Sequence, residues 1–244
     1  MTIVFYRSLG AALVLLCAGF RDLRSLRFSP HLLIGVCAFA LTQITFVGST
    51  FYTSASTAVF LQYTAKIYIG IFGGFYLSER ASRSDWISAV IVVFGMSLFL
   101  LHGGNTSGSS DSLGVALGIL CGFSYSWVLM ALRKLKGDNS LHVMFLGNAV
   151  VVLVAAPFLD TIAVHDALFI SGFGSIHLGL SWILLLSVIK HFKAMQFAIV
   201  TSIGPVLNPL WVYAFTGELP SMIEILGAVV IFIGVLYSIV RGRA

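Results

Sequence analysis

The chain has 244 residues, of which 59% are hydrophobic and 9% are charged, and its mean hydropathy is +1.02. Because a soluble domain holds roughly 45–50% apolar and about 25% charged residues, this composition excludes an ordinary water-soluble fold. The formal net charge of +5 comes from cations between apolar runs, which indicates membrane topology and not a nucleic-acid-binding surface.

Nine apolar runs follow one another along the chain, each about twenty residues long, and a helix of that length spans a hydrocarbon core of roughly 30 Å. The sequence therefore predicts an all-α, polytopic transmembrane helix bundle in the lipid bilayer. The predicted spans cover residues 2–20, 31–53, 57–77, 84–102, 113–132, 140–158, 167–189, 194–215 and 221–240.

Lysine and arginine lie in alternate loops. The loops after the first, third, fifth and seventh runs and the carboxy-terminal tail share these cations, while the other loops have none. Cytoplasmic loops attract such residues, so we expect these loops and the carboxy terminus in the cytoplasm. The cations are Arg21, Arg24, Arg27, Arg80, Arg83, Arg133, Lys134, Lys136, Lys190, Lys193, Arg241 and Arg243.

The sequence matches itself without gaps at one constant offset, the one that carries Gly35 onto Gly174. The offset crosses five spans, an odd number, so it predicts two inverted repeats, a signature of transporters. The alternative is an old duplication kept for packing alone. Further matched pairs include Ala55 with Ala194, Glu79 with Glu218, Ser82 with Ser221, Ala89 with Ala228, Val90 with Val229 and Gly95 with Gly234.

The repeat predicts one transmembrane domain of two halves, residues 1–102 with four helices and residues 113–240 with five. The same offset carries the run at 113–132 to a place before Met1, so the first half lacks its opening helix. Two interpretations stay open: a shortened chain, or a natural nine-helix form with an open groove.

Four segments carry a resemblance to a known family: FYRSLGAALVLL, TAVFLQYTAKIYIGIFGGFYLSER, DWISAVIVVFGMSLFL and GPVLNPLWVYAFTGELPSMIEILGAVVIFIGV. They resemble the drug/metabolite transporter superfamily, and within it the EamA-type bacterial exporters of ten helices. This resemblance implies two inverted five-helix halves around a cavity, exporting amino acids or related solutes across the bacterial inner membrane by alternating access. The chain departs from the family in lacking the first helix and in reading YTAKIY where the family often reads YTAP.

All nine acidic residues fall in loops or in the first turns of runs. This distribution argues against a proton relay through a membrane carboxylate and, with no HExxH or GxSxG context, against an enzyme. Glu79 and Glu218 are expected to cap helix starts or to pair with nearby cations. The three cysteines lie in apolar runs without metal-ligand spacing, so no metal or cofactor is predicted.

Lys66 is the strongest candidate for solute binding. A lysine at the centre of a span costs about 2.5–3.5 kcal/mol, so its ammonium should face a cavity or a partner. It either binds a carboxylate- or phosphate-bearing solute, or is satisfied by backbone carbonyls or tyrosine hydroxyls in a purely structural role. His177 could likewise titrate in a site or serve as a packing histidine.

Prolines mark the eighth run as a second candidate. Pro205 and Pro209 cannot donate backbone hydrogen bonds, which frees carbonyls beside Asn208 and predicts either a discontinuous helix at a cavity or a plain kink. On the third run, Gln62, Tyr63 and Lys66 form a polar stripe. We expect this stripe to face the interior of the helix bundle and not the lipid. The looser candidates are Gln43, Tyr125, Trp127, Trp182 and Trp211.

Glycines at four-residue spacing, Gly70 and Gly74 and again Gly114, Gly118 and Gly122, predict close helix contacts within one half of the chain or in a homodimer. The sequence thus favours a secondary transporter of a small polar metabolite, with the solute between the third and eighth runs. The alternative is a truncated or non-transporting membrane subunit or sensor that associates through its glycine faces.

Overall fold

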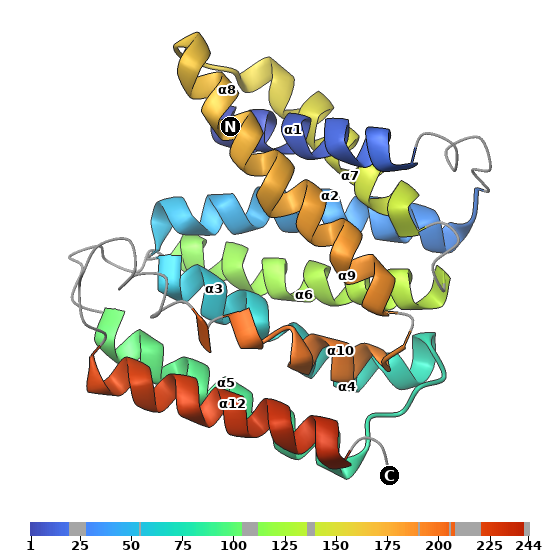
Figure 1. Cartoon of the computed structure of the whole chain (residues 1–244), viewed down its shortest axis with the longest axis vertical. Helices are drawn as coiled ribbons and strands as arrows, with labels where there is room; N and C mark the ends of the chain where they lie inside the picture. Colours follow the sequence, from blue (N-terminus) through green and yellow to red (C-terminus); the bar gives the residue numbers. More distant parts are fainter. Residues whose placement is uncertain are drawn as a thin grey trace. The chain divides into compact units, whose positions relative to one another are not determined.

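The computed structural model describes residues 1–19, 28–53, 55–103, 112–135, 140–189, 191–204, 206–207 and 221–241. Every regular element within these ranges is helical, which confirms the all-α prediction (Figure 1). The elements are α1 (Thr2–Gly19), α2 (Pro30–Tyr52), α3 (Ala55–Tyr63), α4 (Ala65–Tyr76), α5 (Arg83–Gly103), α6 (Ser112–Leu135), α7 (Ser140–Ala155), η2 (Ala156–Phe158), α8 (Val164–Gly174), η3 (Ser175–Leu180), α9 (Ser181–Ile189), α10 (Ala194–Val200) and α12 (Met222–Arg241).

Five of these helical stretches are long and apolar enough to cross a membrane, namely Pro30–Tyr52, Thr57–Tyr76, Ser112–Leu135, Ser140–Phe158 and Val164–Ile189. Thr2–Ala18 and Ile225–Arg241 are shorter apolar helices. When α3 is joined to α4, α7 to η2, and α8 to η3 and α9, the described residues form nine helical segments in the predicted order. The chain is a multi-pass membrane protein.

The helices group into two compact units. Unit 1 comprises Met1–Val47 and Trp127–Phe192, and unit 2 comprises Gly48–Ser126 and Lys193–Ala244. Each unit therefore contains segments from both of the halves that the sequence predicts.

Unit 1 is held together by contacts of α1 with α7 and α8. Val4 of α1, Ala40 and Val47 of α2 and Val151 of α7 form a buried apolar cluster. On another side of α1, glycines allow the backbones to touch, because a side chain at Gly174 would collide with the carbonyl of Arg7. The seventh span is also irregular, since the π-helical segment η3 separates α8 from α9.

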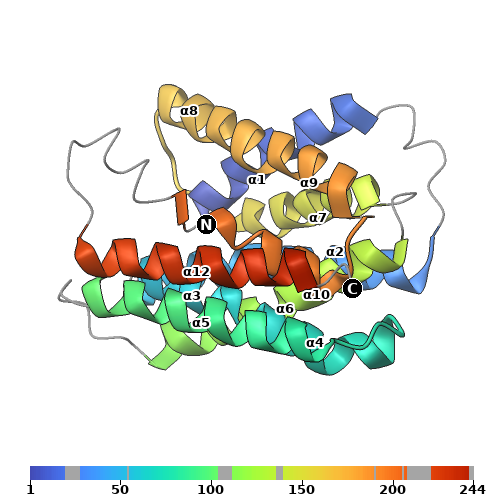
Figure 2. The ribbon, with the colours of Figure 1, turned by 60° about the horizontal axis from the view of Figure 1, so that its bottom comes forward.

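Unit 2 contains a symmetric pair formed by α5 and α12, which lie side by side in both views (Figures 1 and 2). A Cβ atom at Gly95 would lie 2.8 Å from Ile231 Cγ1, and one at Gly234 would lie 2.9 Å from Val92 Cγ2. These two contacts run in opposite directions along the helices, so α5 and α12 are antiparallel. The repeat offset carries Gly95 onto Gly234 and Val92 onto Ile231, and such reciprocal contacts are what a two-fold axis generates.

The glycines of α6 pack within the chain. Gly114 lies against Tyr52, and Gly118 against Leu61 and Ser49. The Ser49 hydroxyl also donates a hydrogen bond of 2.9 Å to the Gly114 carbonyl. These contacts lie within the chain but join the two predicted halves, so the prediction that this surface packs within one half is wrong for them.

Candidate functional site

The third span is broken near its middle, at Thr64, which separates α3 from α4. The Thr64 amide donates to the Leu61 carbonyl at 3.2 Å, and the Thr64 hydroxyl donates to the same oxygen at 2.5 Å. These bonds reach back three residues instead of four and tighten the chain into a turn. The turn is local, because Thr64 keeps right-handed helical dihedral angles (φ −63°, ψ −12°) and Thr57–Tyr76 remains one helical stretch.

Lys66 lies directly after this break, and its side chain is 1% exposed. Its Nζ atom donates to the Tyr63 carbonyl at 3.3 Å and lies 4.0 Å from the centroid of the Tyr63 ring. Within the described part of the chain, no carboxylate lies within salt-bridge distance of this ammonium. The cation is therefore held by a carbonyl and an aromatic face, and it lacks an anionic counterion there.

Close approach of α6 shapes the break. A Cβ atom at Gly122 would lie 2.5 Å from both the Leu61 carbonyl oxygen and the Thr64 hydroxyl. A residue larger than glycine would thus collide with the two atoms that form the turn. One turn further along α6, Tyr125 is partly buried.

A second break lies in the eighth span. Helix α10 ends at Val200, and the amide of Ser202 donates to the Ile199 carbonyl at 3.0 Å, again three residues back. The repeat offset carries Thr64 onto Ile203, one residue after Ser202, so the two breaks lie one residue apart in the register of the predicted repeat.

The two breaks lie close together within unit 2. The Tyr63 hydroxyl is 3.6 Å from the place where a Cβ atom of Gly204 would stand, and α4 contacts α10. Tyr63 therefore links Lys66, through its carbonyl and ring, to the irregular backbone of the eighth span. This arrangement forms the candidate site.

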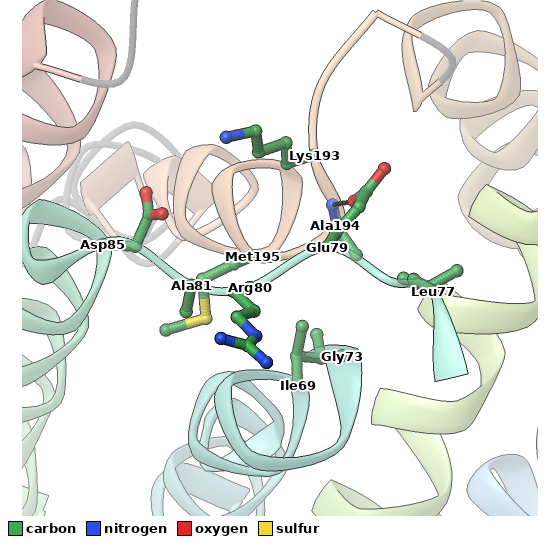
Figure 3. Close-up of a pocket in the computed structure, with 10 residues that line it drawn as sticks. All are labelled: Ile69, Gly73, Leu77, Glu79, Arg80, Ala81, Asp85, Lys193, Ala194 and Met195. Carbon is green, nitrogen blue, oxygen red and sulfur yellow. Dashed lines mark hydrogen bonds between the residues drawn. The ribbon is translucent and has the colours of Figure 1, made fainter. Parts of the chain in front are cut away.

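Glu79 joins the loop after α4 to the start of α10. Its Oε2 atom accepts a hydrogen bond of 3.2 Å from the Ala194 amide, which confirms the prediction that Glu79 caps a helix start. Figure 3 shows the surrounding pocket, whose volume of about 10 Å³ has room for one water molecule.

Asp85 lines the same pocket from the first turn of α5. Its Oδ2 atom accepts hydrogen bonds from the Ser82 amide at 2.8 Å and from the Ser82 hydroxyl at 2.7 Å. Its Oδ1 atom is buried and has no hydrogen-bond partner among the described residues. The pocket of one water molecule lies where this oxygen could be satisfied.

The other predicted site residues that the structure describes belong to unit 1. Gln43 is buried, and its Oε1 accepts a hydrogen bond of 3.3 Å from Arg7 Nη2. Trp182 is buried edge-to-face against Phe39, with ring centroids 5.9 Å apart. Trp127 is partly buried.

His177 lies in the π-helical segment η3 and is exposed. Its ring stacks on Phe173 with a centroid separation of 5.2 Å. The remaining predicted residues lie outside the described part of the chain: Pro205, Asn208, Pro209, Trp211 and Glu218.

Sequence reasoning did not assign to the site three residues that the structure brings into view. Thr64 and Gly122 form the break beside Lys66; Gly122 was predicted only as a packing glycine, and a threonine in mid-span does not by itself indicate a turn. Asn148 is fully buried in α7, where its Nδ2 donates to the Met144 carbonyl at 2.8 Å and its Oδ1 has no partner among the described residues. A polar amide inside an apolar run was the signal there.

Known proteins match the chain along almost its whole length. The profile of the EamA-like transporter family matches residues 1–101 and 112–240. The pseudopaline exporter CntI of Pseudomonas aeruginosa (strain UCBPP-PA14) is 25% identical over 239 residues, which cover 95% of this chain and 83% of that protein.

Transporter YxxF of Bacillus subtilis (strain 168) is 24% identical over 197 residues, or 78% of this chain. The match covers 63% of the length of YxxF. A solved crystal structure superposes with a TM-score of 0.81 at 16% identity, covering 99% of this chain and 88% of the other. That likeness shows the fold.

The multi-pass helical fold and these relatives define the class as membrane transporters. The chain belongs to the EamA-like transporter family.

Proposed function

We propose that this transporter exports a small polar metabolite carrying a carboxylate or phosphate group, such as an amino acid or a related solute. Lys66 is the observation that carries the proposal. A buried ammonium without an anionic partner among the described residues is costly, and a solute anion would supply the missing charge. Tyr63 would line the same position through its ring and hydroxyl.

Alternating access is the proposed mechanism, with the solute held between the third and eighth spans. The breaks at Thr64 and Ser202, one residue apart in the repeat register, support it, because irregular backbone at membrane depth occurs where it faces protein, water or solute. This mechanism needs an inverted repeat. Two observations support one: the reciprocal contacts between α5 and α12, and the two separate segments that the family profile matches.

The proposed location is the bacterial inner membrane, with the carboxy terminus in the cytoplasm. The bacterial relatives and the one-sided distribution of loop cations support this placement. Export is the proposed direction because CntI is an exporter.

A thermal-shift screen of the purified protein tests the proposal. Small carboxylates, phosphate esters and amines are added in turn, and a binding solute raises Tm by mass action. We expect carboxylates or phosphates to stabilise the wild type, Lys66→Arg to keep part of the shift, and Lys66→Met to lose it. Stabilisation by amines alone, or an unchanged carboxylate shift in Lys66→Met, would reject the assignment.

A further inference from the structure

An apolar groove runs along the face shared by α5 and α12. It is lined by Val90, Ile91 and Phe94 of α5 and by Val230 and Ile233 of α12, and its volume is about 360 Å³. No polar atom contributes to the lining, and Val90, Phe94 and Ile233 are each more than half exposed. The sequence predicts that both helices cross the membrane, and an entirely apolar, open groove in such a pair suits a hydrocarbon chain.

The two helices contribute to the groove equivalently. The repeat offset carries Ile91 onto Val230 and Phe94 onto Ile233. The groove therefore lies on the reciprocal contact that Gly95 and Gly234 make.

One end of the groove face is positively charged. Arg83 is the first residue of α5 and Arg241 the last of α12, so the antiparallel pairing brings both to the same end. Both side chains are exposed, and among the described residues neither forms a salt bridge. This end therefore presents two cations without an acidic partner there.

Helical spacing places these arginines on the face of the groove. Arg83 precedes Phe94 by eleven residues and Arg241 follows Val230 by eleven, which is close to three turns in each helix. Eleven residues rise about 16 Å, roughly half the thickness of the hydrocarbon core. A lipid tail in the groove would thus place its phosphate at the level of the arginines.

We propose that an anionic phospholipid binds here, with an acyl chain in the groove and its phosphate between Arg83 and Arg241. Basic side chains between helices on the cytoplasmic side suit such headgroups. A second copy of the chain fits less well, because a symmetric contact through this face would bring four arginine side chains together.

Native mass spectrometry of the full chain in detergent tests this site, with phosphatidylglycerol and phosphatidylcholine as probes. We expect preferential retention of phosphatidylglycerol. Arg83→Gln and Arg241→Gln should each weaken its binding about fivefold, given about 1 kcal/mol per cation. Lys134→Gln, which removes an exposed cation at the end of α6, should leave binding unchanged.

Ile233→Trp tests the groove itself, because the larger ring fills the space and leaves both arginines in place. It should reduce retention of phosphatidylglycerol while size-exclusion chromatography still shows a monodisperse protein. Equal retention of both lipids, or arginine variants that bind like the wild type, would overturn the proposal. A lipid-free dimer disrupted by Ile233→Trp would also overturn it and assign the face to a second copy.

Discussion

At the scale of single residues, a lysine ammonium inside a membrane span needs oxygen ligands, an aromatic face or an anion around it. Lys66 has one carbonyl and one ring, both from Tyr63. An ammonium carries three donors, so this environment leaves room for a further acceptor. The proposed solute anion would provide both the acceptor and the opposite charge.

Lys66 could be found from the sequence because a lysine in mid-span is rare and expensive. The turn at Thr64 could not be predicted from the sequence, because threonine is also tolerated within regular helices. What decides the geometry is the approach of Gly122, which lies far along the chain in another helix. Sequence patterns do not contain such tertiary contacts.

Gly122→Ala should destabilise the protein, since its Cβ atom would lie 2.5 Å from the Leu61 carbonyl and the Thr64 hydroxyl. Overpacking of this kind costs about 1–3 kcal/mol. The matched control is Gly172→Ala in α8, where no atom lies within 4 Å of the new Cβ. Unfolding in mixed micelles by increasing SDS measures both, and equal stability of the two variants would contradict this packing.

At the scale of helices, the third and eighth spans differ from the uninterrupted runs of apolar sequence. Their backbones break within one residue of the same position in the predicted repeat, and Glu79 connects the end of α4 to the start of α10. From Pro205 and Pro209 the sequence predicted a discontinuous helix or a plain kink in the eighth span, and the described irregularity begins after Val200. Hydrogen bonds from the Thr201 and Ser202 hydroxyls to the Ala198 carbonyl accompany it.

Glu79→Ala should lower stability by about 0.5–2 kcal/mol, because it removes a hydrogen-bond acceptor from the first turn of α10. Glu79→Gln keeps a hydrogen-bond acceptor and should therefore lose less stability than Glu79→Ala. Asp166→Asn is the exposed control, since its carboxylate pairs with an exposed His165 and contributes little. Thermal unfolding in detergent compares the three, and a Glu79→Ala variant as stable as the control would refute the cap.

The α5–α12 pair predicts an asymmetry between two matching glycines. A Cβ atom at Gly95 would lie 3.0 Å from backbone atoms of Gly227 and Ile231, whereas one at Gly234 would meet side-chain atoms of Ile91 and Val92. Side chains can move more readily than backbone, so Gly95→Ala should be the more destabilising. Denaturant titration of both variants measures the two losses of stability. A larger loss of stability for Gly234→Ala than for Gly95→Ala would be inconsistent with this contact.

At the scale of the whole molecule, hydropathy and composition were sufficient to predict the structural class, a bundle of membrane helices. Long apolar runs require helices in a bilayer, and the structure has them. The distribution of candidate residues was less predictable: Lys66 and Tyr63 belong to unit 2, while Gln43, Trp182 and His177 belong to unit 1. A one-dimensional pattern identifies polar residues in apolar runs but does not specify which of them pack together.

The cation distribution predicts a cytoplasmic carboxy terminus, because twelve loop and tail cations fall on one predicted side of the membrane. A green fluorescent protein fused after Ala244 should fluoresce in bacteria, whereas an alkaline phosphatase fused there should be inactive. The opposite pair of results would invert the proposed topology.

Transport in proteoliposomes tests the central claim, that Lys66 binds the transported anion. The solute that gives the largest thermal shift is loaded inside, and uptake of its radiolabelled form is followed as counterflow. We expect accumulation by the wild type and an initial rate at least about tenfold lower for Lys66→Met, matching the loss of roughly 1.4 kcal/mol of binding free energy. Counterflow by Lys66→Met at the wild-type rate would contradict it.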